Sequence, residues 1–209
     1  GRAEPVRRAG SGRDHRVGAG GDDLLVVSGP EATVLRQVGE TFTTYADLSP
    51  LMTGCNEIVV DGRGNTYVNG FATTGVIAMI DPAGAARLVA DGIDFPNGMV
   101  VTPDNSTLII AESMASRLTA FDIDTDGSLS NRRVWAELGS GGDGITMDAE
   151  GAVWSSAAID GQSCCIRVAE GGAILDRIDL GQGCFACMLG GSDGRTLFMC
   201  CAPDFDAGA

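Results

Sequence analysis

A repeat of 43 to 45 residues constrains this fold more than any other feature of the sequence. Each copy holds a turn rich in Asp and Gly, followed by a short run of β-forming residues. Five segments share this layout, namely GDDLLVVS (21–28), DGRGNTYVN (61–69), PDNSTLIIA (103–111), DAEGAVWSS (148–156) and SDGRTLFMC (192–200). The turn aspartates of the last four copies are 43, 44 and 45 residues apart, at Asp61, Asp104, Asp148 and Asp193. A repeat of this kind is typical of arrays in which one small unit packs on the next.

The apolar runs within each copy favour a β-propeller. A short apolar run precedes each turn, as in residues 58–60 and 99–101, and two more follow the run after the turn. Four short strands in about 40–45 residues make one propeller blade. A helical solenoid is the structural alternative, but no apolar pattern with a period of 3.6 residues extends over a helix-length stretch.

The two ends of the chain are incomplete as repeats. Residues 1–20 show no apolar alternation, so we expect an irregular or disordered segment there and a first repeat without its innermost strand. The last repeat contains only two strand-like runs before Ala209. We therefore expect an incomplete propeller over residues 21–209, with about three complete blades between two partial ones.

Composition argues against several classes of protein. The net charge of −14 disfavours nucleic acid and anionic membranes as partners. No run of 18 apolar residues occurs, and the first 20 residues lack the apolar core of a secretory signal. Seven cysteines, including two adjacent pairs, do not suggest a disulfide framework. A reducing compartment is the simpler interpretation, so we expect a cytoplasmic protein.

Residue types also limit the catalytic chemistry. His15 is the only histidine, which argues against Ser-His-Asp and Cys-His arrangements. Cys184 and Cys187 form one CxxC motif without a second. Because their neighbours alternate as in an inner strand, we favour buried structural cysteines over a zinc site.

Three oxygen-bearing side chains recur with the period of the repeat. The segments GCNEIVV, FPNGMVV and GGDGITM place Asn56, Asn97 and Asp143 at equivalent positions, 41 and 46 residues apart. In a propeller the innermost strands line the central channel, so their first residues ring its mouth. Two amides and one carboxylate are hard oxygen ligands suited to Ca²⁺, Mg²⁺ or Mn²⁺. The alternative is that each residue only caps a turn, as Asn and Asp often do.

The same segments resemble the SMP-30/gluconolactonase family of six-bladed propellers. The matching stretches are CNEIVVD, FPNGMVVTPDNSTLIIAES, RLTAFDIDTDGSLSNRRVWAEL and DGITMDAEGAVW. The resemblance implies a divalent cation (Ca²⁺, or Mg²⁺, Mn²⁺ or Zn²⁺) held by Asn97 and Asp143, with Asn56 contacting a small lactone substrate. It also implies a first-blade Glu ligand in an EGP-type segment, which this sequence lacks.

Two functions of different classes remain open. The first is a metal-dependent hydrolase that opens a lactone ring, with Asp143 taking a proton from water. The second is a propeller that binds a partner without catalysis, since one fold hosts many functions.

Overall fold

The computed structural model describes residues 15–20 and 23–203, and its regular elements are all strands. They form four antiparallel sheets of four strands and one sheet of two, which we call blades 1 to 5. Blade 1 contains β1 (His15–Gly20), β2 (Asp23–Ser28), β3 (Thr33–Val38) and β4 (Thr41–Asp47). Blade 2 contains β5 (Gly54–Val60), β6 (Thr66–Phe71), β7 (Gly75–Ile80) and β8 (Ala86–Ile93).

The remaining strands follow the same order. Blade 3 contains β9 (Pro96–Val101), β10 (Thr107–Glu112), β11 (Arg117–Ile123) and β12 (Leu129–Glu137). Blade 4 contains β13 (Ile145–Met147), β14 (Val153–Ile159), β15 (Gln162–Val168) and β16 (Ile174–Asp179). Blade 5 contains β17 (Gly183–Gly190) and β18 (Thr196–Ala202). Nothing in the described part of the chain forms a helix that could cross a membrane.

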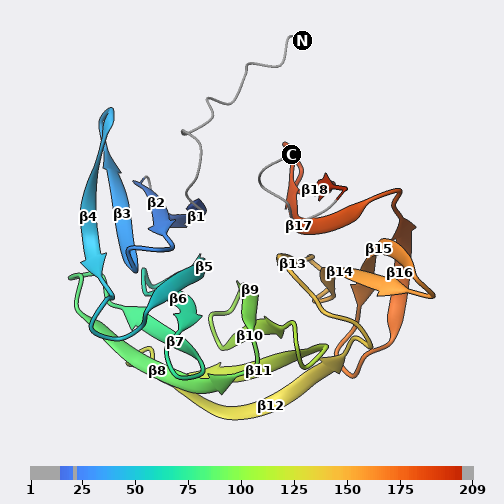
Figure 1. Ribbon diagram of the computed structural model, residues 1–209, viewed down its shortest axis with the longest axis horizontal. Coiled ribbons are helices and arrows are strands. Elements are labelled where there is room, and N and C mark those ends of the chain that lie inside the picture. The colour runs from blue at the N-terminus through green and yellow to red at the C-terminus, as the bar shows by residue number, and fades with distance from the viewer. Residues whose placement is uncertain (1–14, 21–22, 204–209) are drawn as a thin grey trace.

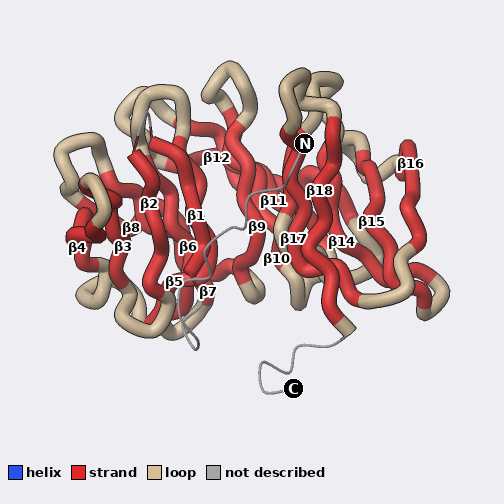
Figure 2. Tube along the Cα trace, turned by 90° about the horizontal axis from the view of Figure 1, so that it is seen from above, coloured by secondary structure: helices blue, strands red, loops and turns tan. Residues whose placement is uncertain are grey.

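The blades stand side by side in an arc around a common axis. In Figure 1 the first strand of each blade faces the centre of the arc, and β4, β8, β12 and β16 lie at its outside. Figure 2 shows the same strands from the side, with the turns gathered at the two ends of the blades. The predicted β-propeller is confirmed.

The repeated aspartates build the turns between the first two strands of a blade. Asp61 Oδ1 accepts the backbone N–H groups of Arg63 and Asn65 at 2.9 and 2.8 Å, and Asp148 Oδ1 accepts those of Glu150 and Ala152 at 2.9 and 3.1 Å. Such bonds replace the backbone partners that a tight turn cannot provide. The period of the sequence is therefore the period of these turns.

The first blade corrects one expectation. We expected residues 1–20 to be irregular and the first repeat to lack its innermost strand, but His15–Gly20 forms β1 and pairs with β2 along its whole length. Within residues 15–20 and 23–203 there are thus four four-stranded blades and one two-stranded blade. Backbone hydrogen bonds to a neighbouring strand do not require apolar alternation, which is why the sequence pattern missed β1. Residues 1–14 lie outside the described residues.

The core lies between blades rather than inside one layer. Three apolar clusters fill the interfaces of blades 1 and 2, blades 2 and 3, and blades 3 and 4. Neighbouring side chains of one strand face different interfaces: Tyr67 packs toward blade 3, while Val68 packs toward blade 1. The middle strands are covered on both faces, so β7 is buried at every position.

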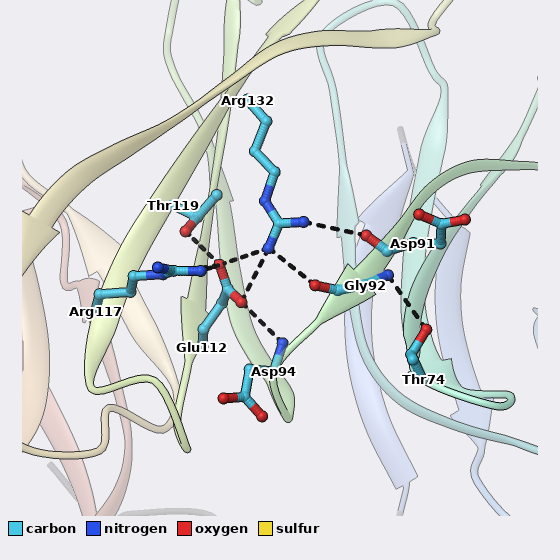
Figure 3. Close-up of polar contacts among 8 residues, drawn as sticks. All are labelled: Thr74, Asp91, Gly92, Asp94, Glu112, Arg117, Thr119 and Arg132. Atoms are coloured by element: carbon cyan, nitrogen blue, oxygen red, sulfur yellow. Dashed lines mark hydrogen bonds and ion pairs between the residues drawn. The ribbon is translucent and has the colours of Figure 1, made fainter.

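A buried carboxylate joins blades 2 and 3. Glu112, at the end of β10, has no exposed side-chain surface and accepts hydrogen bonds from Arg117, Arg132 and the Thr119 hydroxyl (Figure 3). Arg132 also donates to the carbonyl oxygens of Asp91 and Gly92 in β8, at 3.2 and 3.0 Å. One guanidinium therefore ties the outer strand of blade 3 to the outer strand of blade 2.

Removing the charge of Glu112 should destabilise the chain. We expect Glu112→Gln to lower the free energy of unfolding by about 2–3 kcal/mol, somewhat less than for a fully buried pair. The expected loss is smaller than for a fully buried pair because the side chains of Arg117 and Arg132 are 31% and 35% exposed. Urea unfolding at pH 7 measures the change, with the exposed Glu170→Gln as the matched control. Equal stability of Glu112→Gln and Glu170→Gln would contradict a stabilising role for the Glu112 ion pairs.

The stability difference between wild type and Glu112→Gln should depend on pH. Burial raises the pKa of Glu112, but the hydrogen bonds from Thr119, Asp94 and Arg132 outweigh burial and hold the pKa below its ordinary value of 4.5. The carboxylate thus contributes stability fully above pH 4.5, and that contribution falls as the pH drops through the lower folded pKa. We expect the stability gap between wild type and Glu112→Gln to be constant from pH 7 to about 5 and to narrow in stronger acid.

Candidate functional site

The three predicted residues lie at the same end of adjacent innermost strands. Asn56 is near the start of β5, Asn97 near the start of β9, and Asp143 two residues before β13. The Asn56 Nδ2 group donates to the carbonyl oxygen of Pro96 at 2.9 Å and lies 3.5 Å from Asn97 Oδ1. These contacts hold the Asn56 amide of blade 2 against Pro96 and Asn97 of blade 3.

A short hydrogen-bond chain connects Asn97 to the segment of Asp143. Asn97 Nδ2 donates to Ser113 Oγ at 3.2 Å, and the Ser113 hydroxyl donates to the carbonyl oxygen of Gly142 at 2.6 Å. With its amide nitrogen bound to Ser113, Asn97 turns its Oδ1 atom toward Asn56. Asn97 and Asp143 line one pocket of about 400 Å³, so the structure brings these two residues together.

Supporting side chains that the sequence analysis did not single out repeat with the blades. Asn69, Glu112 and Ser156 are buried, and each follows its turn aspartate by eight residues. Each accepts a backbone N–H at the entry to an innermost strand: Asn69 from Glu57 at 3.2 Å, Glu112 from Asp94 at 2.8 Å, and Ser156 from Asp143 at 2.9 Å. Asn69 also donates to the carbonyl oxygen of Asn97 at 2.6 Å. Their spacing of 43 and 44 residues was the signal that could have revealed them.

Two glycines let the innermost strands approach closely at the site. A Cβ atom on Gly98 would lie 2.5 Å from the Ile145 nitrogen and 2.6 Å from the Asp143 oxygen. A Cβ atom on Gly144 would lie 2.9 Å from the Cα atom of Ala186. Each glycine directly follows a predicted site residue, Asn97 or Asp143. The lack of a side chain at the next position is therefore what allows these strands to meet.

The chemistry of the donors suits a hard cation. Amide and carboxylate oxygens are the ligands that Ca²⁺, Mg²⁺ and Mn²⁺ prefer. Over residues 24–203 no three His, Cys, Asp or Glu side chains gather in a way that could hold a metal ion. A cation at this mouth would therefore depend on Asp143 and on the neutral oxygens of Asn97 and Asn56.

Five of the seven cysteines are buried in this fold. Cys184 and Cys187 are buried, at 8% and 5% exposure, and all seven cysteines are free thiols. A hydrogen bond with Cys165, together with burial, raises the pKa of Cys184. Burial also raises the pKa of Cys55 to about 12. Protonated thiols are poor nucleophiles at neutral pH, so the expectation of buried structural cysteines fits their surroundings.

Comparison with known proteins identifies the family. The family model of the SMP-30/Gluconolactonase/LRE-like region matches residues 10–203. The chain belongs to this family. A relative in the SMP-30/gluconolactonase/LRE-like family, the 6-deoxy-6-sulfogluconolactonase of Pseudomonas putida, is 30% identical over 130 residues, which cover 60% of this chain and 44% of that protein. The chain thus spans less than half the length of this curated relative.

Solved structures of SMP-30/gluconolactonase/LRE-like proteins share the fold. A luciferin-regenerating enzyme superposes with a TM-score of 0.75 at 20% identity, covering 90% of this chain and 69% of that one. Regucalcin from Agrobacterium tumefaciens, described as a calcium-binding protein, superposes with a TM-score of 0.73 at 18% identity, covering 88% and 66%. At these identities the superpositions establish the propeller fold.

The close approach at Gly98 generates a prediction. Gly98→Ala should push β9 away from the segment before β13, because its Cβ atom would meet backbone atoms that cannot rotate aside. We expect a loss of about 1–3 kcal/mol in the free energy of unfolding. Urea unfolding measures it against Gly181→Ala, since nothing lies within 4 Å of a Cβ atom at Gly181. An unchanged urea midpoint for Gly98→Ala would contradict the close packing.

Proposed function

We propose that this chain carries the site of a metal-dependent hydrolase that opens a lactone ring. The observation that carries the proposal is the shared pocket of Asn97 and Asp143 at the channel mouth, with Asn56 beside it. The names of relatives support the reaction class, since one family member is a sulfogluconolactonase and another is the pentonolactonase XacC of Haloferax volcanii. The calcium-binding regucalcin supports a divalent cation.

Each of the three site residues would have a different role in the reaction. Asn97 and Asp143 would hold the cation, which supplies electrophilic polarisation of the lactone carbonyl when it is bound. Asn97 is anchored through Nδ2 to Ser113, so it presents a fixed neutral oxygen. The backbone N–H of Asp143 is held by Ser156, which fixes where the carboxylate enters the pocket. Asn56 would orient the substrate from the neighbouring blade.

The hydrolysis step needs a proton acceptor and a proton donor. Asp143 would accept a proton from the attacking water, whose oxygen bonds to the carbonyl carbon. The bond between that carbon and the ring oxygen then breaks, and the proton passes to the ring oxygen. The product is an open-chain hydroxy acid, and the carboxylate of Asp143 is restored.

A binding propeller without catalysis is the alternative. It is favoured by one observation: the described part of the candidate site offers a single carboxylate, that of Asp143. Fewer charged ligands lower the affinity for a hard cation. The two functions differ in whether lactone opening follows the concentration of metal.

Lactone opening should therefore need much free metal. We expect hydrolysis of glucono-δ-lactone by this chain to be slight at micromolar Ca²⁺ or Mn²⁺ and to rise toward roughly millimolar concentrations. Asp143→Asn should remove the metal-dependent rate, since it removes both the charge and the proton acceptor. A pH-stat assay with and without chelator measures the rate.

The matched control is Asp160→Asn, in the exposed turn between β14 and β15. The Asp160 backbone has a φ of 52°, which Asn tolerates well, so this variant should keep the wild-type rate. Hydrolysis that neither chelator nor Asp143→Asn reduces would contradict the metal mechanism. A chain that binds the cation without opening any lactone would favour the binding propeller.

A further inference from the structure

Phe95 has an unusual backbone next to the candidate site. Its φ is 59°, in the left-handed region, where a bulky side chain is strained. It also precedes Pro96, a position that favours extended backbone. Strain of this kind persists only where surrounding contacts enforce it, and it gathers at functional sites.

The buried carboxylate of Glu112 enforces this conformation. Glu112 Oε2 accepts the backbone N–H of Asp94 at 2.8 Å, and Arg132, bound to the same carboxylate, holds the carbonyl oxygens of Asp91 and Gly92 (Figure 3). The residue that follows β10 adds a second contact, because the N–H of Ser113 donates to the Phe95 carbonyl oxygen at 3.1 Å. The segment that carries Phe95 is therefore fixed from both sides.

The enforced conformation presents an apolar surface at the mouth. Phe95 is 43% exposed and Met114 is 70% exposed, and both line the pocket shared by Asn97 and Asp143. The two side chains also line an adjoining hollow with Phe71, whose ring centroid is 5.2 Å from that of Phe95. Phe71, Phe95 and Met114 form what we call the apolar platform.

Three of the four serines that line the pocket have side-chain hydrogen bonds within the protein. Ser113 donates to the Gly142 carbonyl, Ser156 accepts from Asp143, and Ser140 accepts from the Ala158 N–H at 3.1 Å. Among the described residues that line the pocket, Asp143 is the one charged side chain. A ligand with many hydroxyl groups would lose water there and meet one charged side chain and a few serine hydroxyls in return.

We propose that the site accepts lactones bearing an alkyl or aryl substituent, which lies on the apolar platform while the ring carbonyl faces Asn97 and Asp143. This inference rests on the proposed hydrolase and names the class of its substrate. Phe95 and Met114 are then specificity-determining residues. The rigid hold on Phe95 fixes the platform before the substrate arrives, so little conformational freedom is lost on binding.

The test compares three lactones with one ring size. The probes are δ-valerolactone, its pentyl-substituted form and glucono-δ-lactone, each assayed for kcat/KM with wild-type chain in saturating Ca²⁺ or Mn²⁺. We expect the pentyl-substituted lactone to exceed both others by roughly tenfold, the scale of discrimination that apolar pockets provide. Saturation-transfer NMR from the protein to the pentyl chain measures binding independently of hydrolysis.

Phe95→Gly is the decisive variant. Glycine adopts a positive φ about as readily as a negative one, so this change removes the ring and relieves strain without unfolding the chain. It should raise KM for the pentyl-substituted lactone about tenfold more than it raises KM for δ-valerolactone. Met114→Ala should act in the same direction. The matched control is Phe42→Ala, because Phe42 is an exposed aromatic residue on β4, at the outside of blade 1.

The outcomes separate this inference from the proposed function. Saturation transfer to the pentyl chain that Phe95→Gly abolishes supports the platform even if no lactone is opened, in which case the hydrolase fails alone. Faster opening of glucono-δ-lactone, unaffected by Phe95→Gly, overturns the platform and leaves the hydrolase standing. Absence of both binding and hydrolysis overturns both.

Discussion

This site depends on one repeated hydrogen bond, in which a backbone N–H in or just before an innermost strand donates to a buried side chain on the second strand of the same blade. Asn69, Glu112 and Ser156 make that bond in blades 2, 3 and 4. An unpaired buried N–H is costly, so each bond fixes the path of the segment that it reaches. Those segments carry Asn56, Asn97 and Asp143. The repeat of one supporting bond thus places Asn56, Asn97 and Asp143 at equivalent positions in three neighbouring blades.

Glu112 differs from Asn69 and Ser156 because its buried side chain is charged. Its partners are two arginines, the Thr119 hydroxyl and the Asp94 backbone, so its charge is compensated and its pKa is held low. The same contacts keep Phe95 in a left-handed conformation beside the pocket. One set of contacts therefore both stabilises the blade interface and holds a strained aromatic residue. This coupling explains why an apolar surface can remain exposed at a mouth whose other side holds a carboxylate.

Several parts of the structure could be predicted from the sequence because they are local. The turn aspartates repeat every 43 to 45 residues, and Asp61 and Asp148 build their turns from bonds within four residues. The positions of Asn56, Asn97 and Asp143 follow from the same register, although their role as ligands stays a proposal. The strand β1 could not be predicted, since its place is decided by pairing with β2 rather than by its own pattern. The family resemblance rested on short motifs, and the family match over residues 10–203 confirms it.

The sequence by itself determined the period, the turns and therefore the order of the blades. Only the tertiary structure decided which buried polar groups pair with which backbone atoms. In the sequence, Glu112 is one polar residue among several at strand ends. Nothing near it in the sequence indicates that its partner is Arg132, 20 residues away. Gly98 and Gly144 likewise read as turn residues until the neighbouring blade is in place. Hydrogen bonds and close contacts between blades join residues far apart in the chain, so their partners exist only once the blades have packed.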